Sequence, residues 1–165
     1  GFPPSSFAAA GLFDVLEHIE DETSALNEIH RLLAPGGRLF LTVPAFQVLF
    51  SADDVAAGHH RRYTASRLAR VLKLAGFHTE YQTYLFWPLP APVLLFRTVP
   101  TWLGRRRGAD PAQASSEHVP SGFAAKLVDQ ALDYEFRVIA RGGRMAFGGS
   151  CLAVARREPV ADEGA

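Results

Sequence analysis

The chain has 165 residues, of which 48% are hydrophobic and 21% are charged, a balance typical of one globular domain with a buried core. Seventeen lysine and arginine residues cancel seventeen acidic ones, which argues against a nucleic-acid partner or a polyanionic tail. The single cysteine, Cys151, excludes an internal disulfide and suits a reducing cytoplasm, where we expect the protein to act.

The first predicted element is a strand over residues 7–13, an almost wholly apolar run typical of a strand buried on both faces of a parallel sheet. Asp21 can cap the helix that follows, whose apolar face consists of Ala25, Leu26, Ile29, Leu32 and Leu33. We expect Pro35-Gly36-Gly37 to end this helix, because proline breaks the hydrogen-bond ladder and glycine accepts a left-handed turn. A strand over residues 38–43 then completes a crossover between parallel strands.

The middle of the chain predicts a loop, a helix and a strand. Residues 46–63 show no sustained period and are expected to form a loop over the carboxyl edge of the sheet. A helix begins after Thr64 and ends at Gly76, with Leu68, Val71, Leu72 and Ala75 as its apolar stripe. Residues 77–86 are rich in aromatic and β-branched side chains and predict the next strand.

Residues 84–122 are expected to form an apolar insertion followed by a polar linker at 105–121. Prolines interrupt the apolar part, so we expect no transmembrane span, while a lid or a peripheral contact with a membrane both stay open. A helix over 124–141 has Leu127, Ala131, Tyr134 and Val138 in one row. The last strand is predicted at 150–155, residues 156–165 are expected to fray, and residues 1–157 form the domain ahead of a disordered tail at 158–165.

Acidic and histidine side chains directly follow the first predicted strand. Asp14, Glu17 and His18 lie where an open α/β sheet binds its ligands, outside the carboxyl ends of the strands. A purely structural interpretation competes with this one. In it, Asp14 bonds to backbone donors of the turn, and Glu17 and His18 form a solvated face.

The run Phe13-Asp14-Val15-Leu16-Glu17-His18-Ile19, with Pro35-Gly36-Gly37, Arg61-Arg62-Tyr63 and Ala75-Gly76-Phe77 after it, resembles the second half of a class I S-adenosylmethionine-dependent methyltransferase, especially of type 11. The resemblance implies a Rossmann-like α/β sheet with an antiparallel last strand, and S-adenosylmethionine as cofactor. It implies that Asp14, Val15 and Glu17 lie beside the cofactor and that His18 acts as base or substrate orienter. Some relatives hold a metal with a Glu-His pair in this turn, but no further ligand set is evident here and we predict no metal site.

The family's glycine-rich cofactor loop and the acidic residue after its second strand are absent from this sequence. We therefore expect the chain to be a C-terminal portion whose N-terminal strands are missing. The strand at 7–13 would then keep an unpaired apolar edge that invites self-association. On this expectation the isolated chain is inactive.

A second candidate cluster lies between residues 51 and 63 and consists of Ser51, Asp53, Asp54, His59, His60, Arg61, Arg62 and Tyr63, of which we assign His59, Arg61, Arg62 and Tyr63 to substrate binding. By resemblance these residues form a substrate-binding loop, and two guanidinium groups can clamp an anionic or carbonyl-bearing substrate. The alternative is that Arg61 or Arg62 pairs with Asp53 or Asp54 and pins the loop.

The function that the resemblance implies is methyl transfer to an oxygen, nitrogen or carbon atom of a small-molecule or lipid-like acceptor. A non-catalytic fragment or binding subunit, which needs a partner to complete its sheet, is the alternative. A Rossmann-like oxidoreductase is disfavoured, because the sequence has no dinucleotide-binding fingerprint.

Overall fold

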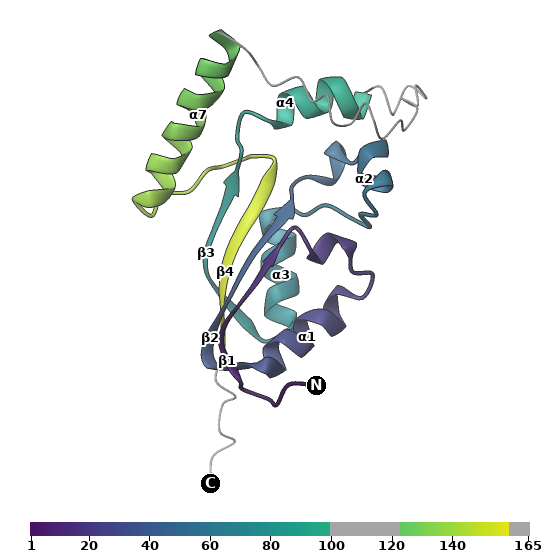
Figure 1. Cartoon of the computed structure of the whole chain (residues 1–165), viewed down its shortest axis with the longest axis vertical. Helices are drawn as coiled ribbons and strands as arrows, with labels where there is room; N and C mark the ends of the chain where they lie inside the picture. Colours follow the sequence, from purple (N-terminus) through teal and green to yellow (C-terminus); the bar gives the residue numbers. More distant parts are fainter. Residues whose placement is uncertain (100–122, 159–165) are drawn as a thin grey trace.

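The computed structural model describes residues 1–99 and 123–158, which contain a four-stranded sheet in the order β1-β2-β4-β3 (Figure 1). β1 (Phe7–Phe13) is parallel to β2 (Leu33–Pro44). The last strand, β4 (Ser150–Arg157), is antiparallel to both of its neighbours, β2 and β3 (Phe77–Leu85). This mixed sheet confirms the predicted α/β fold with an antiparallel last strand.

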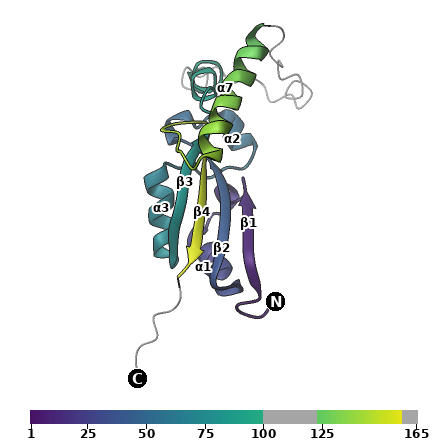
Figure 2. The same cartoon turned by 90° about the vertical axis from the view of Figure 1, so that its left-hand side faces the viewer.

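Two helices, α1 (Glu22–Leu32) and α3 (Ala65–Leu74), cover one face of the sheet (Figures 1 and 2). Side chains along β2 alternate, so that Leu39 and Leu41 are fully buried while Phe40 between them is 37% exposed. The buried side chains of β2 belong to one core with Leu26 of α1 and Leu68 of α3. Each buried leucine contributes roughly 1.5–3 kcal/mol relative to an exposed one, so this face provides most of the fold's stability.

β1 is an edge strand, which corrects the expectation that both of its faces are buried. Phe7 and Phe13 are 38% and 63% exposed, and within the described residues β1 pairs only with β2. The expected apolar strand edge is therefore present.

The turn between α1 and β2 differs from the prediction. α1 ends at Leu32, and the buried Leu33, expected on the helix, already belongs to β2. Gly36 takes the predicted left-handed conformation, with φ of 79°, but in a bulge within β2 and not at a helix end. The pairing with β1 slips there, from Phe7 opposite Leu33 to Ala9 opposite Arg38.

The predicted loop at 46–63 contains two short helices, η2 (Gln47–Leu49) and α2 (Ala52–Ala56). α2 begins at a capping box, in which the Asp54 N–H donates to the Ser51 side chain and the Ser51 N–H donates to the Asp54 carboxylate. Ser51 Oγ also accepts the Asp53 N–H. The prediction missed this helix because it relied on apolar period, which five residues cannot show.

The later part of the chain contains α4 (Pro90–Val93), the π-helical segment η3 (Leu94–Thr98) and α7 (Phe123–Ala140). In the row noted on α7, Leu127 and Tyr134 are 51% and 56% exposed, while Ala131 and Val138 are half-buried. The helix is held by the buried Glu135, whose carboxylate accepts hydrogen bonds from the N–H groups of Phe86 and Trp87, each at 2.9 Å.

At the C-terminal end, β4 extends through Arg156 and Arg157, where fraying was expected. The predicted linker at 105–121 and nearly all of the predicted tail lie outside the described residues. None of the helices in the described part of the chain has the length and apolar character that a membrane crossing requires.

Candidate functional site

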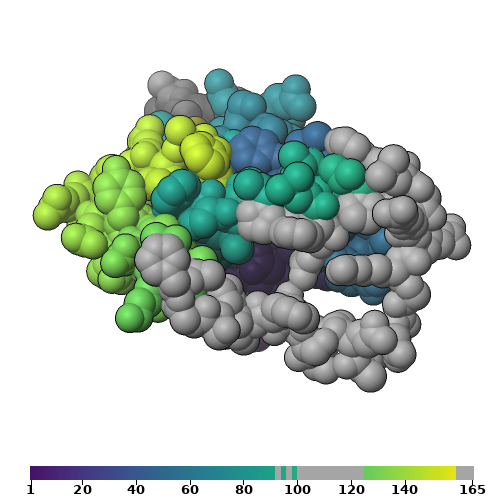
Figure 3. All heavy atoms as spheres, turned by 90° about the horizontal axis from the view of Figure 1, so that it is seen from above, coloured from purple at the N-terminus to yellow at the C-terminus, as the bar shows by residue number. Residues whose placement is uncertain are grey.

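The strands β1, β2 and β3 run in the same direction, so their carboxyl ends meet at one edge of the sheet. Each strand is followed within two residues by a non-glycine residue with positive φ, namely Asp14 (52°), Phe46 (59°) and Phe86 (59°). Such backbone strain costs of order 1–3 kcal/mol per residue and tends to gather at functional sites. Figure 3 looks down on this end of the molecule, where the teal segment around α4 lies above the purple N-terminal segment.

A cavity of about 350 Å³ opens at this edge. Four predicted site residues line it, namely Asp14, Glu17, His59 and Arg62, together with the apolar Phe86 and Leu89. The lining thus combines two carboxylates, an imidazole and a guanidinium with an apolar side. The other four predicted site residues do not belong to this lining, namely Val15, His18, Arg61 and Tyr63.

Asp14 is fixed at the junction of β1 and β2. Its N–H donates to the Thr42 carbonyl at 3.1 Å, and the Thr42 hydroxyl lies 3.2 Å from Asp14 Oδ1. In the described part of the chain the Asp14 carboxylate is thus held by the side chain of Thr42 on β2, and not by backbone donors of the turn as the structural interpretation expected. Its exposed side chain also lines the cavity.

Glu17 lies in η1 (Leu16–His18) and is fully buried, whereas His18 beside it is exposed. The expectation of a solvated face is therefore wrong for Glu17. Neither carboxylate oxygen of Glu17 has a hydrogen-bond partner among the described residues. Burial raises the pKa of Glu17, and the nearby Asp14 carboxylate raises it further. A buried polar group without a partner is rare in folded proteins and needs an explanation.

His59, which belongs to the second candidate cluster, lies against the η1 turn. Its ring lies edge-on to that of His18, with 4.6 Å between ring centroids. Potential ligand atoms of Glu17, His18 and His59 all lie within 4.8 Å of one another. A backbone hydrogen bond from the His60 N–H to the Glu17 carbonyl, at 2.9 Å, joins the two segments. The structure therefore brings together residues that the sequence presented as two clusters.

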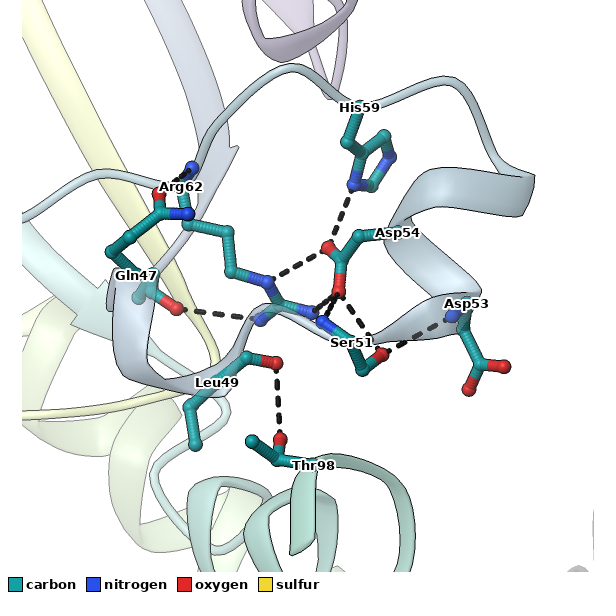
Figure 4. A network of polar contacts seen from close by, with 9 residues as sticks. Gln47, Leu49, Ser51, Asp53, Asp54, His59, Arg62 and Thr98 are labelled. Atoms are coloured by element: carbon teal, nitrogen blue, oxygen red, sulfur yellow. Dashed lines mark hydrogen bonds and ion pairs between the residues drawn. The ribbon is translucent and has the colours of Figure 1, made fainter. Parts of the chain in front are cut away.

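Asp54 anchors this loop (Figure 4). Its carboxylate accepts hydrogen bonds from Arg62 Nε at 2.8 Å and Nη2 at 3.0 Å, from the Ser51 N–H at 2.8 Å, and lies 2.9 Å from His59 Nδ1. Burial alone would raise the pKa of Asp54, but the bonds from Arg62, His59 and Ser51 outweigh it and hold that pKa below its usual range. The alternative prediction, that an arginine pairs with an aspartate and pins the loop, is confirmed for Arg62.

Arg61 and Tyr63 bond to Glu22 in the first turn of α1. Arg61 Nη1 lies 3.2 Å from the Glu22 carboxylate, to which the Tyr63 hydroxyl and Arg67 also donate. Tyr63 is fully buried, and burial together with Glu22 raises its pKa. Sequence reasoning missed Glu22, because nothing in its local pattern points to a partner so far along the chain. Substrate binding by Arg61, Arg62 and Tyr63 stays a prediction.

Comparison with known proteins shows the family. A model described as a methyltransferase domain matches residues 1–82. A Mycolicibacterium smegmatis protein named "Probable S-adenosylmethionine-dependent methyltransferase" is 30% identical over 80 residues, which are 47% of this chain and 31% of that protein. The chain belongs to the class I S-adenosylmethionine-dependent methyltransferases. The prediction of a class I methyltransferase with S-adenosylmethionine as cofactor is confirmed, and its type 11 group stays a prediction.

Solved structures share the methyltransferase fold. An S-adenosylmethionine-dependent methyltransferase from Mesorhizobium loti has a TM-score of 0.51 at 17% identity over 94% of this chain and 63% of its own. The [4+2]-cyclase SpnF has a TM-score of 0.51 at 22% identity over 95% of this chain and 52% of its own. At such low sequence identity the likeness shows a shared fold and not a shared activity, because one fold can host different reactions. The chain spans about a third of the curated relative and about half of SpnF.

Proposed function

We propose that this chain forms part of a methyltransferase active site, in which a methyl group passes from S-adenosylmethionine to a small-molecule or lipid-like acceptor. The observation that carries the proposal is the cavity at the carboxyl ends of the parallel strands, lined by Asp14, Glu17, His59 and Arg62. Open α/β sheets bind their ligands at this edge. The apolar Phe86 and Leu89 give the same cavity a surface suited to an apolar acceptor.

The charges of the lining fit the cofactor. S-adenosylmethionine carries a sulfonium and an ammonium group, both of them cations. Asp14 contributes one carboxylate to the cavity, and Glu17 contributes a second one that has no hydrogen-bond partner in the described chain. We therefore assign Asp14, Glu17 and the intervening Val15 to the cofactor side of the site.

When bound, the cofactor supplies an activated methyl group, so the protein mainly aligns the acceptor and handles its proton. The acceptor nucleophile attacks the methyl carbon while the carbon–sulfur bond breaks, and the acceptor's proton passes to a base. His18 is exposed next to Glu17 and is assigned to orient the acceptor or to take this proton. His59 and Arg62 are assigned to the substrate side because they line the cavity. Arg61 and Tyr63 are assigned to it because they hold the same loop against α1.

A binding subunit that completes its sheet with a partner is the second candidate. The exposed edge of β1, with Phe13, and the uncovered sheet face, with Phe40, favour it. The same edge supports self-association, and the exposed Leu89 and Leu95 support a peripheral membrane contact. A cytoplasmic location and the lack of a nucleic-acid partner belong to the proposal as well.

Calorimetric titration of the full native protein with S-adenosylhomocysteine tests the first candidate. We expect binding, and we expect Asp14→Ala to weaken it about tenfold or more, since hydrogen bonds to charged groups contribute about 1.5–3 kcal/mol. Asp129→Ala removes the same charge from an exposed position on α7 and should leave binding unchanged. A folded protein that does not bind the ligand would favour the binding subunit.

A further inference from the structure

Three side chains from two distant segments converge beside the cavity. Glu17, His18 and His59 each offer a ligand atom, all within 4.8 Å of one another. One carboxylate and two imidazoles form a ligand set for zinc, manganese or iron(II). Ligands lie about 2.0–2.2 Å from such an ion and thus at most about 4.4 Å apart, so small side-chain rotations would close this set around an ion. We propose that Glu17, His18 and His59 bind one divalent transition-metal ion.

The unpartnered carboxylate of Glu17 is the second observation that points to a ligand. Its side chain is fully buried, and both of its oxygens lack a hydrogen-bond partner in the described part of the chain. An ionised carboxylate buried alone is strongly unfavourable unless a cation compensates it. An ion held between Glu17 and the two imidazoles provides that compensation, whereas a solvated surface cluster would leave Glu17 exposed.

Asp54 prepares His59 for this role. His59 Nδ1 lies 2.9 Å from the Asp54 carboxylate, and an N–H donated there leaves Nε2 as the free ligand atom. The ring nitrogen of a metal-bound histidine that is not on the metal usually donates its N–H to a carboxylate, a carbonyl or a water, which fixes the tautomer and orients the ring. Arg62 and Ser51 in turn hold the buried Asp54 (Figure 4), so Asp54 is a positioning residue of the site.

The two segments are joined independently of any ion. The His60 N–H donates to the Glu17 carbonyl at 2.9 Å, and Arg61 donates to the Glu20 carbonyl at 2.8 Å. Three protein ligands leave coordination positions open, as in catalytic rather than structural metal sites. With an ion as the direct partner of Glu17, the Asp14 carboxylate is the one left to face the cofactor's cations. The role of His18 in catalysis rests on the proposed function. With a ring nitrogen bound to the ion, His18 orients the acceptor and does not act as the base.

The test measures metal binding by the full native protein purified without a histidine tag. After dialysis against equimolar zinc, manganese or magnesium, we expect about one zinc or manganese ion per chain and less magnesium, which prefers oxygen ligands. Glu17→Gln, His18→Ala and His59→Ala should each weaken zinc binding by at least about tenfold in calorimetric titration. His60→Ala removes an exposed neighbouring histidine and should bind zinc as the unmodified protein does.

Zinc binding that is absent, or that is the same in Glu17→Gln as in His60→Ala, would overturn the site. Glu17→Gln is nearly isosteric, and circular dichroism of each variant confirms that it is folded. As a second readout, cobalt(II) at this site should give visible absorption bands that Glu17→Gln loses and His60→Ala retains. Titrating the same samples with S-adenosylhomocysteine separates the two proposals, because cofactor binding can fail while the metal site persists, and the reverse.

Discussion

Replacing Arg62 by methionine should strongly destabilise the protein. Methionine keeps much of the apolar stem but removes both donors to Asp54, which lie at 2.8 and 3.0 Å. The two side chains are 12% and 1% exposed, so the substitution leaves a buried carboxylate without its countercharge. Breaking a buried ion pair in this way costs about 3–5 kcal/mol. We expect the lower end, about 3 kcal/mol, because Asp54 keeps its bonds to Ser51 and His59.

Urea unfolding followed by circular dichroism at neutral pH measures this loss. Arg38→Met is the matched control, because Arg38 pairs with Glu80 at 2.7 Å while the two side chains are 53% and 28% exposed. A pair so exposed contributes about 0–1 kcal/mol. Adding Asp54→Asn to Arg62→Met should recover part of the loss, since no buried charge then remains. An unfolding free energy that falls no further in Arg62→Met than in Arg38→Met would contradict the contribution of the buried ion pair, and so would a double variant that shows the full sum of the single losses.

Three further predictions concern acid stability, thiol reactivity and association. Because the pKa of Asp54 is lowered in the folded protein, its carboxylate contributes stability that is complete above the ordinary pKa of 3.8 and is lost as the pH falls through the lower folded pKa. Acid unfolding of Asp54→Asn should lack this loss of stability, and a profile equal to that of the unmodified protein would contradict the prediction. Burial raises the pKa of Cys151 to about 12, so a thiol reagent at pH 8 should label it only in denaturant, and rapid labelling of the folded protein would exclude that burial. Phe13→Ser, at a side chain 63% exposed on the β1 edge, should change the unfolding free energy by less than about 0.5 kcal/mol yet reduce self-association in sedimentation experiments; equal association by both proteins would exclude this edge as the contact.

Features that depend on neighbouring residues could be predicted from the sequence. α3 begins after Thr64, whose hydroxyl accepts the Arg67 N–H, and the chain turns at Gly76 with φ of 82° before β3. Caps, apolar period and glycine turns act over a few residues, so their signal is local. The family was predicted from a resemblance that short runs such as Phe13-Asp14-Val15-Leu16-Glu17-His18-Ile19 and Pro35-Gly36-Gly37 carry. The capping box of Ser51 and Asp54 was equally readable and was overlooked.

Only the tertiary structure decided the partners within the site. It joined Glu17 and His18 to His59, chose Arg62 as the partner of Asp54, and placed Glu22 against Tyr63. These contacts depend on which strands pair, in which register, and how the loops after them close over the edge of the sheet. Spacing along the chain carries none of that information, because residues far apart in sequence meet only once the whole sheet has formed.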